Sequence, residues 1–253
     1  MSCLSQEEGI KASLEKFGFQ VEKIEERDGI KTPDFYVQKD GDQYTIELKT
    51  KQVNQTTIDD MNYAFSRNEI YSGMVPIEYN GTIQRVVSDA KRQLASKPIY
   101  EDSFNLAWFH CEGHNAVTTM ELFEVVLYGK AFGSEFGEHD EGKAFECYYY
   151  KSIAMFNKYQ NILDGAVITG DESIKILLNI LSPKYKAFKQ SSLCRTFEEG
   201  VQDPLQREAD GNALVVTNDM YGSNIDENIA KKYGFDRFIT IPMQLHVVAA
   251  LHH

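Results

Sequence analysis

Hydrophobic and polar residues follow a helical period at the start of the chain. Ile10, Leu14 and Phe17 recur at positions i, i+4 and i+7, which predicts an amphipathic helix over residues 5–17. Gly18 is a typical residue for the end of such a helix. A short strand is expected next, over residues 19–24.

Two runs between residues 34 and 49 alternate with a period of two. Residues 34–39 and 44–49 are two alternating runs, and Asp40-Gly41-Asp42 joins them. An Asp-Gly pair between alternating runs is a strong signal for a β-hairpin. The sequence therefore predicts two adjacent antiparallel strands.

Beyond residue 50 the pattern is less regular. Residues 51–82 are polar and without clear periodicity, and we expect a long loop or a short helical insertion. The remaining expected elements are helices over 83–95, 173–181 and 225–233, strands over 105–110, 166–171, 214–219 and 238–242, and a helix or strand over 118–128. Strands and helices that alternate in this way predict an α/β fold.

Composition and charge narrow the classes of function. The chain has 253 residues, 42% of them hydrophobic, and its 38 acidic against 26 basic residues give a formal net charge of −12. An acidic chain is poorly suited to coating nucleic acid without sequence preference. The net charge does not exclude an enzyme that binds phosphates through a metal ion and a local basic patch.

The four cysteines and the N-terminal segment indicate the compartment. The cysteines form no Cys-x-x-Cys pair, which argues against a disulfide framework or a zinc ribbon. The N-terminus lacks the pattern of a signal peptide, and no apolar run is long enough to span a membrane. We expect a cytoplasmic protein without membrane association.

The predicted hairpin carries the chemistry. Side chains alternate between the two faces of a strand, so Asp34, Glu47 and Lys49 are expected on one face. Two carboxylates held close together repel each other, and a bound cation removes that conflict. Oxygen ligands favour Mg²⁺, and Mn²⁺ is expected to substitute for it. Such a site suits metal-assisted hydrolysis of a phosphodiester.

These residues resemble the signature of the PD-(D/E)xK nuclease superfamily, which includes restriction endonucleases and archaeal-type Holliday-junction resolvases. Pro33-Asp34 is followed, after a gap, by Glu47-Leu48-Lys49. The expected order of helix, three strands, helix and strand over about residues 5–110 matches the family's common core. The resemblance implies that Asp34 and Glu47 bind the metal, that the Leu48 carbonyl is a further ligand, and that Lys49 assists the attacking water.

The resemblance also suggests further site residues. Many members contribute a glutamate from the first helix, and Glu7 lies on the same helical stripe as Ile10 and Leu14. A favourable anion in the first turn of a helix is the alternative interpretation of Glu7. The family tends to add a glutamine or lysine after the lysine motif, and the candidates are Gln52, Lys91 and Gln93.

Two groups of side chains are candidates for contacts with nucleic acid. Residues 184–195 mix basic and aromatic residues without an acid, which suits an unpaired or distorted strand, although a solvated helix face is the alternative. The expected contact residues are Arg85, Lys91, Arg92, Gln93, Lys184, Lys186, Lys189 and Arg195.

The sequence as a whole predicts an α/β protein with a restriction-endonuclease-like core on a mixed sheet. The core spans residues 1–115, and an α/β extension over 116–253 packs on the same sheet or merges with the core into a single compact domain. The expected activity is that of a Mg²⁺-dependent deoxyribonuclease, an endonuclease acting in restriction, phage defence or repair. DNA is the expected partner, the residues do not separate DNA from RNA, and a homodimer is compatible with cutting both strands.

Two other functions stay open. One is a non-catalytic protein with the nuclease fold that binds a protein or nucleic acid. The other is an α/β protein that binds a small ligand at strand ends near Asp171 and Asp219. The segment His110-Cys111-x-x-His114 matches no standard zinc spacing, and we interpret it as the end of a strand.

Overall fold

The computed structural model describes residues 6–25, 31–51, 55–96, 102–113, 116–137, 142–170 and 173–249. The chain divides into two compact units, each built from three separate stretches. The first unit contains Met1–Lys51, Gln84–Cys111 and Tyr159–Gln202, and the second contains Gln52–Ile83, Glu112–Lys158 and Asp203–His253. The chain passes between the units near the expected boundary at residue 115, and at four other points as well.

A seven-stranded mixed sheet forms the centre of the first unit, in the order β1-β2-β3-β5-β8-β9-β10. The strands are β1 (Gln20–Lys23), β2 (Phe35–Lys39), β3 (Asp42–Lys51), β5 (Phe104–Cys111), β8 (Gly165–Thr169), β9 (Ile174–Leu178) and β10 (Val201–Gln202). Strands β1, β2 and β3 are antiparallel neighbours, and β3, β5 and β8 run parallel. The expected α/β class with a mixed sheet is confirmed.

The hairpin predicted from the Asp-Gly pair is present. Strand β2 pairs with β3 so that Lys39 lies opposite Asp42, which leaves Asp40 and Gly41 as the two loop residues. Their φ angles are 52° and 86°, in the left-handed region that a tight hairpin loop of this kind requires at both positions. The tight loop fixes the register, which decides which side chains lie opposite each other.

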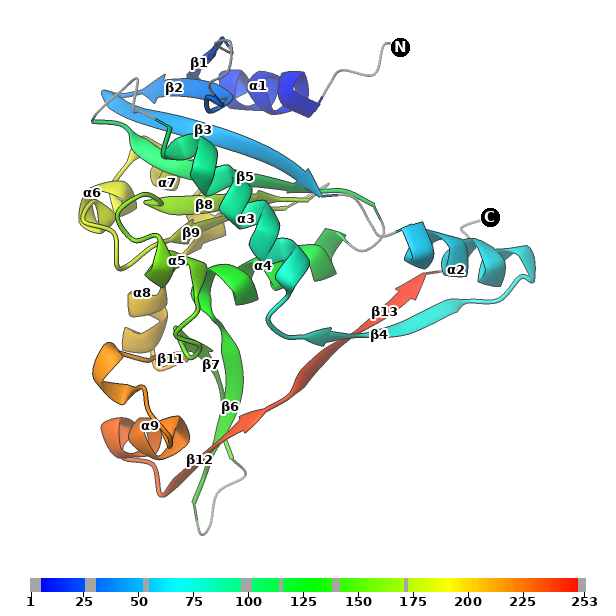
Figure 1. The fold of residues 1–253 in the computed structure, drawn as a ribbon, viewed down its shortest axis with the longest axis vertical. Coiled ribbons are helices and arrows are strands. Elements are labelled where there is room, and N and C mark those ends of the chain that lie inside the picture. Colours follow the sequence, from blue (N-terminus) through cyan, green and yellow to red (C-terminus); the bar gives the residue numbers. More distant parts are fainter. Residues whose placement is uncertain are drawn as a thin grey trace. The chain divides into compact units, whose positions relative to one another are not determined.

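The two faces of the sheet in the first unit are covered by different helices (Figure 1). One face carries Ile46, Leu48 and Trp108, and the first helix packs on it through Ile10 and Leu14. The helices of this unit are α1 (Gln6–Lys16), α3 (Gly81–Leu94, which begins in the second unit), α6 (Tyr185–Lys189), α7 (Ser192–Thr196) and the 3₁₀ turn η1 (Glu198–Gly200). Helices α6 and α7 contribute to the same hydrophobic cluster as α1, and α3 contacts the other face.

The second unit contains two smaller sheets, of order β11-β7-β6-β12 and β13-β4. Its strands are β4 (Tyr71–Ile77), β6 (Ala131–Phe136), β7 (Ala144–Tyr148), β11 (Ala213–Val215), β12 (Arg237–Ile241) and β13 (Met243–Ala249). Its helices are α2 (Gln55–Ser66), α4 (Ala116–Tyr128), α5 (Met155–Lys158), α8 (Pro204–Ala209), α9 (Ile225–Tyr233) and the 3₁₀ turn η2 (Asn218–Met220).

One expected element is right in part and another is wrong. The short helical insertion allowed for residues 51–82 is present as α2, but the same segment also contains strand β4, which forms because it pairs with β13 from the distant end of the chain. The helix expected over 173–181 is strand β9, which pairs antiparallel with β8. Its residues Ile176 and Leu178 enter the same hydrophobic cluster as Trp108. In both cases the partner strand, which the local pattern does not show, decides the structure.

A buried network of charges lies in the second unit. The Lys130 ammonium is 2.7 Å from the Glu124 carboxylate, 3.2 Å from that of Glu146 and 3.4 Å from that of Glu121, and only 1% of the Lys130 side chain is exposed. The three carboxylates raise the pKa of Lys130, although burial alone would lower it. The three carboxylates therefore favour the charged form of Lys130, and its ammonium offsets part of their negative charge.

Among the described helices, none has the length and hydrophobicity needed to cross a membrane.

Candidate active site

The hairpin brings Asp34, Glu47 and Lys49 together on one face of the sheet in the first unit. The pairing of Phe35 with Ile46 places Asp34 directly opposite Glu47, and the Asp34 backbone N–H donates to the Ile46 carbonyl at 3.0 Å. Lys49 follows Glu47 by two residues and therefore points to the same side. The juxtaposition expected from the alternation is present.

Direct contacts hold these three side chains in place. The Leu48 backbone N–H donates to Oδ2 of Asp34 at 2.7 Å, and the Lys49 ammonium forms an ion pair with the Glu47 carboxylate. Lys49 also donates to Oε1 of Gln93 at 2.8 Å, and the Gln93 amide donates to the Thr32 carbonyl at 3.2 Å. Gln93 on α3 therefore fixes the position of Lys49 from outside the hairpin.

The electrostatics of the pair are dominated by burial. The Glu47 side chain is fully buried, and burial together with the nearby Asp34 charge raises its pKa to about 8, although Lys49 acts in the opposite direction. Burial also raises the pKa of Asp34, against the Leu48 N–H and the Lys49 charge, which lower it. Ionising both carboxylates in this protein without a cation is therefore unfavourable.

This conflict predicts how the stability of the metal-free protein depends on pH. The pKa of Glu47 is about 8 in the folded protein against 4.5 for an ordinary glutamate, so the folded state holds a proton that the unfolded chain releases. The stability that this proton contributes is complete below pH 4.5 and is lost as the pH rises to about 8. The loss is at most about 1.4 kcal/mol per pH unit.

The measurement is urea unfolding in a metal chelator across this pH range, for the parent and for Glu47→Gln. The free energy of unfolding of the parent should fall relative to that of the variant as the pH rises. Parallel pH profiles would show that Glu47 keeps an ordinary pKa in the folded protein.

The donor set fits a hard divalent cation. Neither buried carboxylate oxygen of Glu47 has a hydrogen bond of good geometry, although both are acceptors. Among the described residues no group of three or more His, Cys, Asp or Glu side chains converges on one point, and Asp34 and Glu47 stay the predicted side-chain ligands. Mg²⁺ is commonly bound by one or two carboxylates with water and substrate phosphates completing the shell. The Leu48 carbonyl stays a predicted third ligand.

Glu7 lies near this site but has another partner. Its carboxylate is 2.5 Å from the Lys23 ammonium, and 41% of the Glu7 side chain is exposed. The Glu7 charge contributes to raising the pKa of Asp34, so the two carboxylates are within electrostatic reach of each other. A role of Glu7 in binding metal stays a prediction.

The expected contact residues of α3 are Arg85, Lys91, Arg92 and Gln93. Of these, Gln93 contacts Lys49 and so shares the face of the candidate site. The Lys91 ammonium lies 5.0 Å from the centre of the Tyr159 ring, and Arg92 pairs with Asp89 at 3.1 Å on an exposed part of the helix. Arg85 is exposed. Helix α3 therefore carries both Gln93, which contacts Lys49, and the basic residues Arg85, Lys91 and Arg92.

The second basic group, Lys184, Lys186, Lys189 and Arg195, lies on and beside α6 and α7. Its anchor Phe188 packs in the hydrophobic cluster that contains Leu48, on the face of the sheet opposite Glu47. Lys184 donates to the Ser103 carbonyl at 2.7 Å, and Arg195 lies 3.7 Å from Asp40. The fold does not bring this group to the face that carries Glu47 and Lys49.

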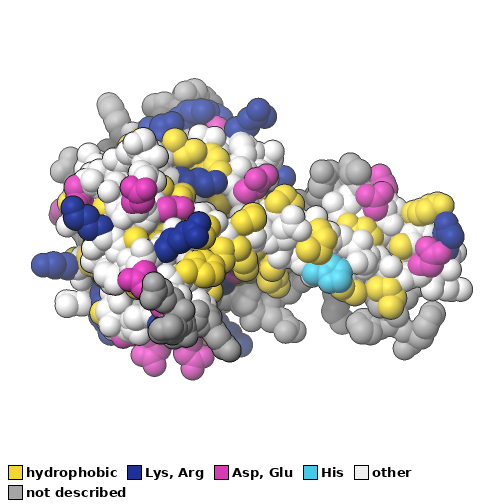
Figure 2. Space-filling view, turned by 90° about the horizontal axis from the view of Figure 1, so that it is seen from below, with side chains coloured by type: hydrophobic (Ala, Val, Ile, Leu, Met, Phe, Trp, Pro, Cys, Tyr) yellow, Lys and Arg dark blue, Asp and Glu magenta, His cyan; other side chains and the backbone are white. Residues whose placement is uncertain are grey.

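The distribution of charge fits the acidic composition. On the face drawn in Figure 2, the described lysine and arginine side chains are interspersed with acidic and hydrophobic ones. On this face the described residues form no broad cationic surface.

The described contacts distinguish the candidates for the additional glutamine or lysine of the site. Of Lys91 and Gln93, only Gln93 has a described hydrogen bond to Lys49, and Gln52 lies outside the described residues. The sequence carries no signal for the Thr32 carbonyl, because its part in orienting Gln93 depends on how α3 packs against the segment before β2.

No protein-family model matches the chain, and neither curated proteins nor solved structures give a significant match. Inference about function therefore depends on the geometry of the site.

Proposed function

We propose that this protein is a metal-dependent nuclease that hydrolyses DNA phosphodiester bonds at Asp34, Glu47 and Lys49. The observation that carries the proposal is the pair of opposed carboxylates, one of them fully buried, beside a lysine that forms an ion pair with the buried carboxylate and that a second element holds in place. Two acids forced together without a cation cost stability, which favours a function that requires a cation there.

The arrangement of elements supports the resemblance to the PD-(D/E)xK nucleases. Helix α1 is followed by the antiparallel strands β1, β2 and β3, and then by α3 and the parallel strand β5. Helix α2 and strand β4 are inserted between β3 and α3. Without this insertion the order is α1, then β1, β2 and β3, then α3 and β5, which is the helix, three strands, helix and strand expected for a restriction-endonuclease-like core.

Each residue has a distinct task in the proposed reaction. Asp34 and Glu47 would hold Mg²⁺, and the Leu48 N–H keeps the Asp34 carboxylate turned toward Glu47. When bound, the ion would polarise a phosphoryl oxygen and lower the pKa of a bound water. Lys49 is placed beside these carboxylates, where its charge can orient the attacking water and stabilise the negative charge that develops on the phosphate.

The direct test is cleavage of linear, circular and single-stranded DNA with and without Mg²⁺ or Mn²⁺. The parent should cut only with metal, and Lys49→Ala should not cut. Lys11→Ala is the matched control, because Lys11 is a partly exposed lysine of the same unit that pairs only with Glu15 among its described contacts. Cutting of circular DNA would identify an endonuclease. Equal rates for the parent and Lys49→Ala would refute the assignment of Lys49.

Gln93 is expected to act as a positioning residue. Gln93→Ala removes the acceptor that holds the Lys49 ammonium, and we expect the cleavage rate to fall about tenfold to a hundredfold with DNA affinity unchanged. Gln93→Glu keeps an acceptor for Lys49 and should retain more activity than the alanine variant. The measurements are single-turnover rates and DNA binding for both variants. A loss of DNA affinity with an unchanged rate would place Gln93 in binding instead.

A binding protein with the same fold is the second candidate. The observation that favours it is the ion pair between Lys49 and Glu47, which already neutralises part of the acidic pair without metal. Calorimetric titration with Mg²⁺ or Mn²⁺ separates the two functions. Metal uptake that disappears in Glu47→Gln supports the nuclease, and no metal uptake by the parent supports the binding protein.

A further inference from the structure

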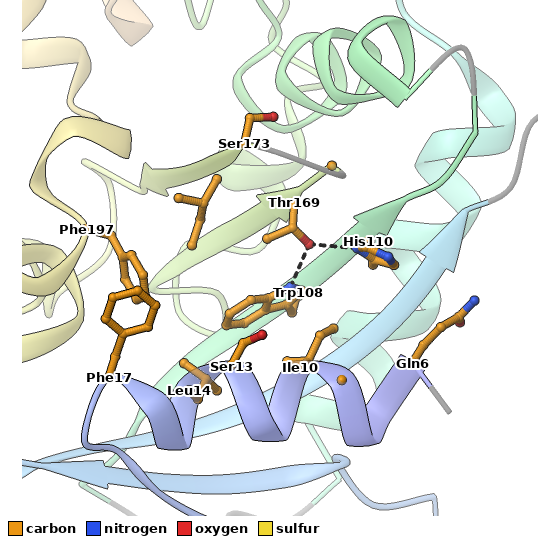
Figure 3. A pocket seen from close by; sticks show the side chains of 13 residues that line it. Gln6, Ile10, Ser13, Leu14, Phe17, Trp108, His110, Thr169, Ser173 and Phe197 are labelled. Atoms are coloured by element: carbon orange, nitrogen blue, oxygen red, sulfur yellow. Dashed lines mark hydrogen bonds between the residues drawn. The ribbon is translucent and has the colours of Figure 1, made fainter. Parts of the chain in front are cut away.

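A pocket lies in the first unit, away from Asp34 and Glu47 (Figure 3). Its volume is about 720 Å³, and helix α1 forms one wall while the ends of β5 and β8 form another. Trp108 and His110 reach it from β5, and Thr169 reaches it from β8. The size is within the range of pockets that hold small organic ligands.

The pocket and the candidate active site lie on opposite faces of the same sheet. Trp108 shares a hydrophobic cluster with Leu48, whereas Glu47 and Lys49 point to the other side of β3. His110 and Thr169 stand at the carboxyl ends of two parallel strands. In α/β sheets, ligands bind preferentially outside the carboxyl ends of parallel strands. This is also the strand end before Asp171 at which the sequence left a small-ligand site open.

The lining of the pocket is aromatic at one end and polar at the other. Phe17 and Phe197 form an edge-to-face pair with ring centres 4.8 Å apart. At the strand ends, Thr169 Oγ1 accepts from Trp108 Nε1 at 3.0 Å and lies 3.0 Å from His110 Nδ1 (Figure 3). The hydroxyl of Thr169 therefore fixes the orientation of both rings.

The described residues that line the pocket include no aspartate, glutamate, lysine or arginine. Polar groups come instead from neutral side chains, among them Gln6, Ser13 and Ser173. Among the described lining residues only His110 can carry a charge, so these residues offer no permanently charged partner for a phosphate or a carboxylate, and burying an unpaired charge is costly. It suits an uncharged ligand with a flat ring and hydrogen-bonding groups along its edge.

Gly9 keeps the wall of α1 open. It lines the pocket from inside the helix, and a Cβ built there would meet nothing within 4 Å. Glycine in a helix interior costs about 0.5–1 kcal/mol relative to alanine. A side chain at this position would project into space that the helix now leaves empty.

We propose that this pocket binds the uncharged ring of a nucleobase. A nucleobase is planar and neutral, it packs against aromatic side chains, and its edge donates and accepts hydrogen bonds. The base can come from a free nucleoside or from an unpaired position of a single strand, whose sugar and phosphate would stay outside the neutral lining. The site is independent of the proposed nuclease activity.

Trp108 makes the proposal directly testable. It is the only tryptophan in the chain, so its fluorescence reports on this pocket alone. The experiment titrates the full chain, in a chelator, with the four nucleosides, with their 5′-monophosphates and with short single-stranded oligonucleotides. At least one nucleoside should change the fluorescence saturably, and its monophosphate should bind no more tightly.

Gly9→Leu and Ala12→Leu are the matched variants. Both add a leucine side chain to α1, but Ala12 is exposed and does not line the pocket. Gly9→Leu should weaken nucleoside binding about tenfold or more, as steric changes inside ligand pockets do, while Ala12→Leu binds like the parent. Circular dichroism checks that both fold, and Ser13→Leu replaces Gly9→Leu if that variant does not.

The results distinguish the two possible sources of the nucleobase, and they include outcomes that would contradict the proposal. A response to oligonucleotides that exceeds the response to nucleosides identifies an unpaired strand as the source, and the reverse identifies a free nucleoside. No response of Trp108 to any nucleoside or oligonucleotide, or equal binding by Gly9→Leu and the parent, overturns the proposal. Because no metal is present and no cleavage is measured, failure here leaves the proposed nuclease untouched, and failure of the nuclease assay leaves this site untouched.

Discussion

Glu47→Gln is expected to abolish metal-dependent DNA cleavage while making the metal-free protein more stable at neutral pH. The carboxylate of Glu47 is fully buried, and burial and Asp34 raise its pKa to about 8. At neutral pH the folded protein keeps a proton on Glu47 that the unfolded chain releases, whereas a neutral amide of nearly the same shape needs no proton, so Glu47→Gln removes this cost of folding. The gain in the free energy of unfolding is on the order of 2 kcal/mol.

The loss of activity has the same origin. The amide cannot supply the negative charge that a divalent cation requires, and metal-ion catalysis is worth several kcal/mol of transition-state stabilisation. We expect cleavage to fall by about a thousandfold or more, since each 1.36 kcal/mol is a factor of ten in rate. The same substitution therefore improves the folded protein and removes its function.

Lys49→Met gives the contrasting result. It should also abolish cleavage, but it leaves Asp34 and Glu47 without the ammonium that now pairs with Glu47, so the metal-free protein should be less stable than the parent. Both variants keep the fold, which circular dichroism verifies. Urea unfolding of the parent should show stabilisation by Mg²⁺, about 2.7 kcal/mol at a hundred times the dissociation constant, and Glu47→Gln should show none. A Glu47→Gln variant that cuts at the parental rate would remove Glu47 from the site.

Lys130→Met is expected to produce the largest loss of stability. The Lys130 ammonium lies 2.7 Å from the carboxylate of Glu124, which is 5% exposed, and it also contacts Glu121 and Glu146. Removing one partner from a buried ion pair leaves an uncompensated charge in a medium of low dielectric constant. Such changes cost about 3–5 kcal/mol.

The measurement is chemical unfolding monitored by circular dichroism, with Lys11→Met as the control. Lys11 pairs with Glu15 at 3.8 Å, and both side chains are more than 40% exposed, so its loss should change stability by less than about 1 kcal/mol. The double variant Lys130→Met with Glu124→Leu should recover much of the stability, because it also removes the buried carboxylate that faces Lys130 in the parent. A loss below about 1 kcal/mol for Lys130→Met would show that water reaches this network and screens it.

The sequence by itself predicted the hairpin and the side chains that lie on each of its faces. The Asp-Gly pair predicted a hairpin between residues 34–39 and 44–49, and the structure shows that its loop is Asp40 and Gly41 alone, which gives the register that places Asp34 opposite Glu47. Alternation along a strand is a local property, so Glu47 and Lys49 were assigned to the same face without knowledge of the rest of the chain. The stripe of Ile10 and Leu14 likewise predicted the buried face of α1.

Only the tertiary structure decided which distant segments meet. Strand β4 exists because β13, more than 160 residues later, pairs with it, and β9 is a strand because β8 lies beside it. Gln93 was one candidate among several until α3 packed next to β3 and brought its amide to Lys49. The pocket beside Trp108 arose in the same way, from α1 and the ends of two strands that are adjacent only in the fold. Periodicity records which side of an element is buried, whereas pairing between remote segments depends on the free energy of the whole folded chain.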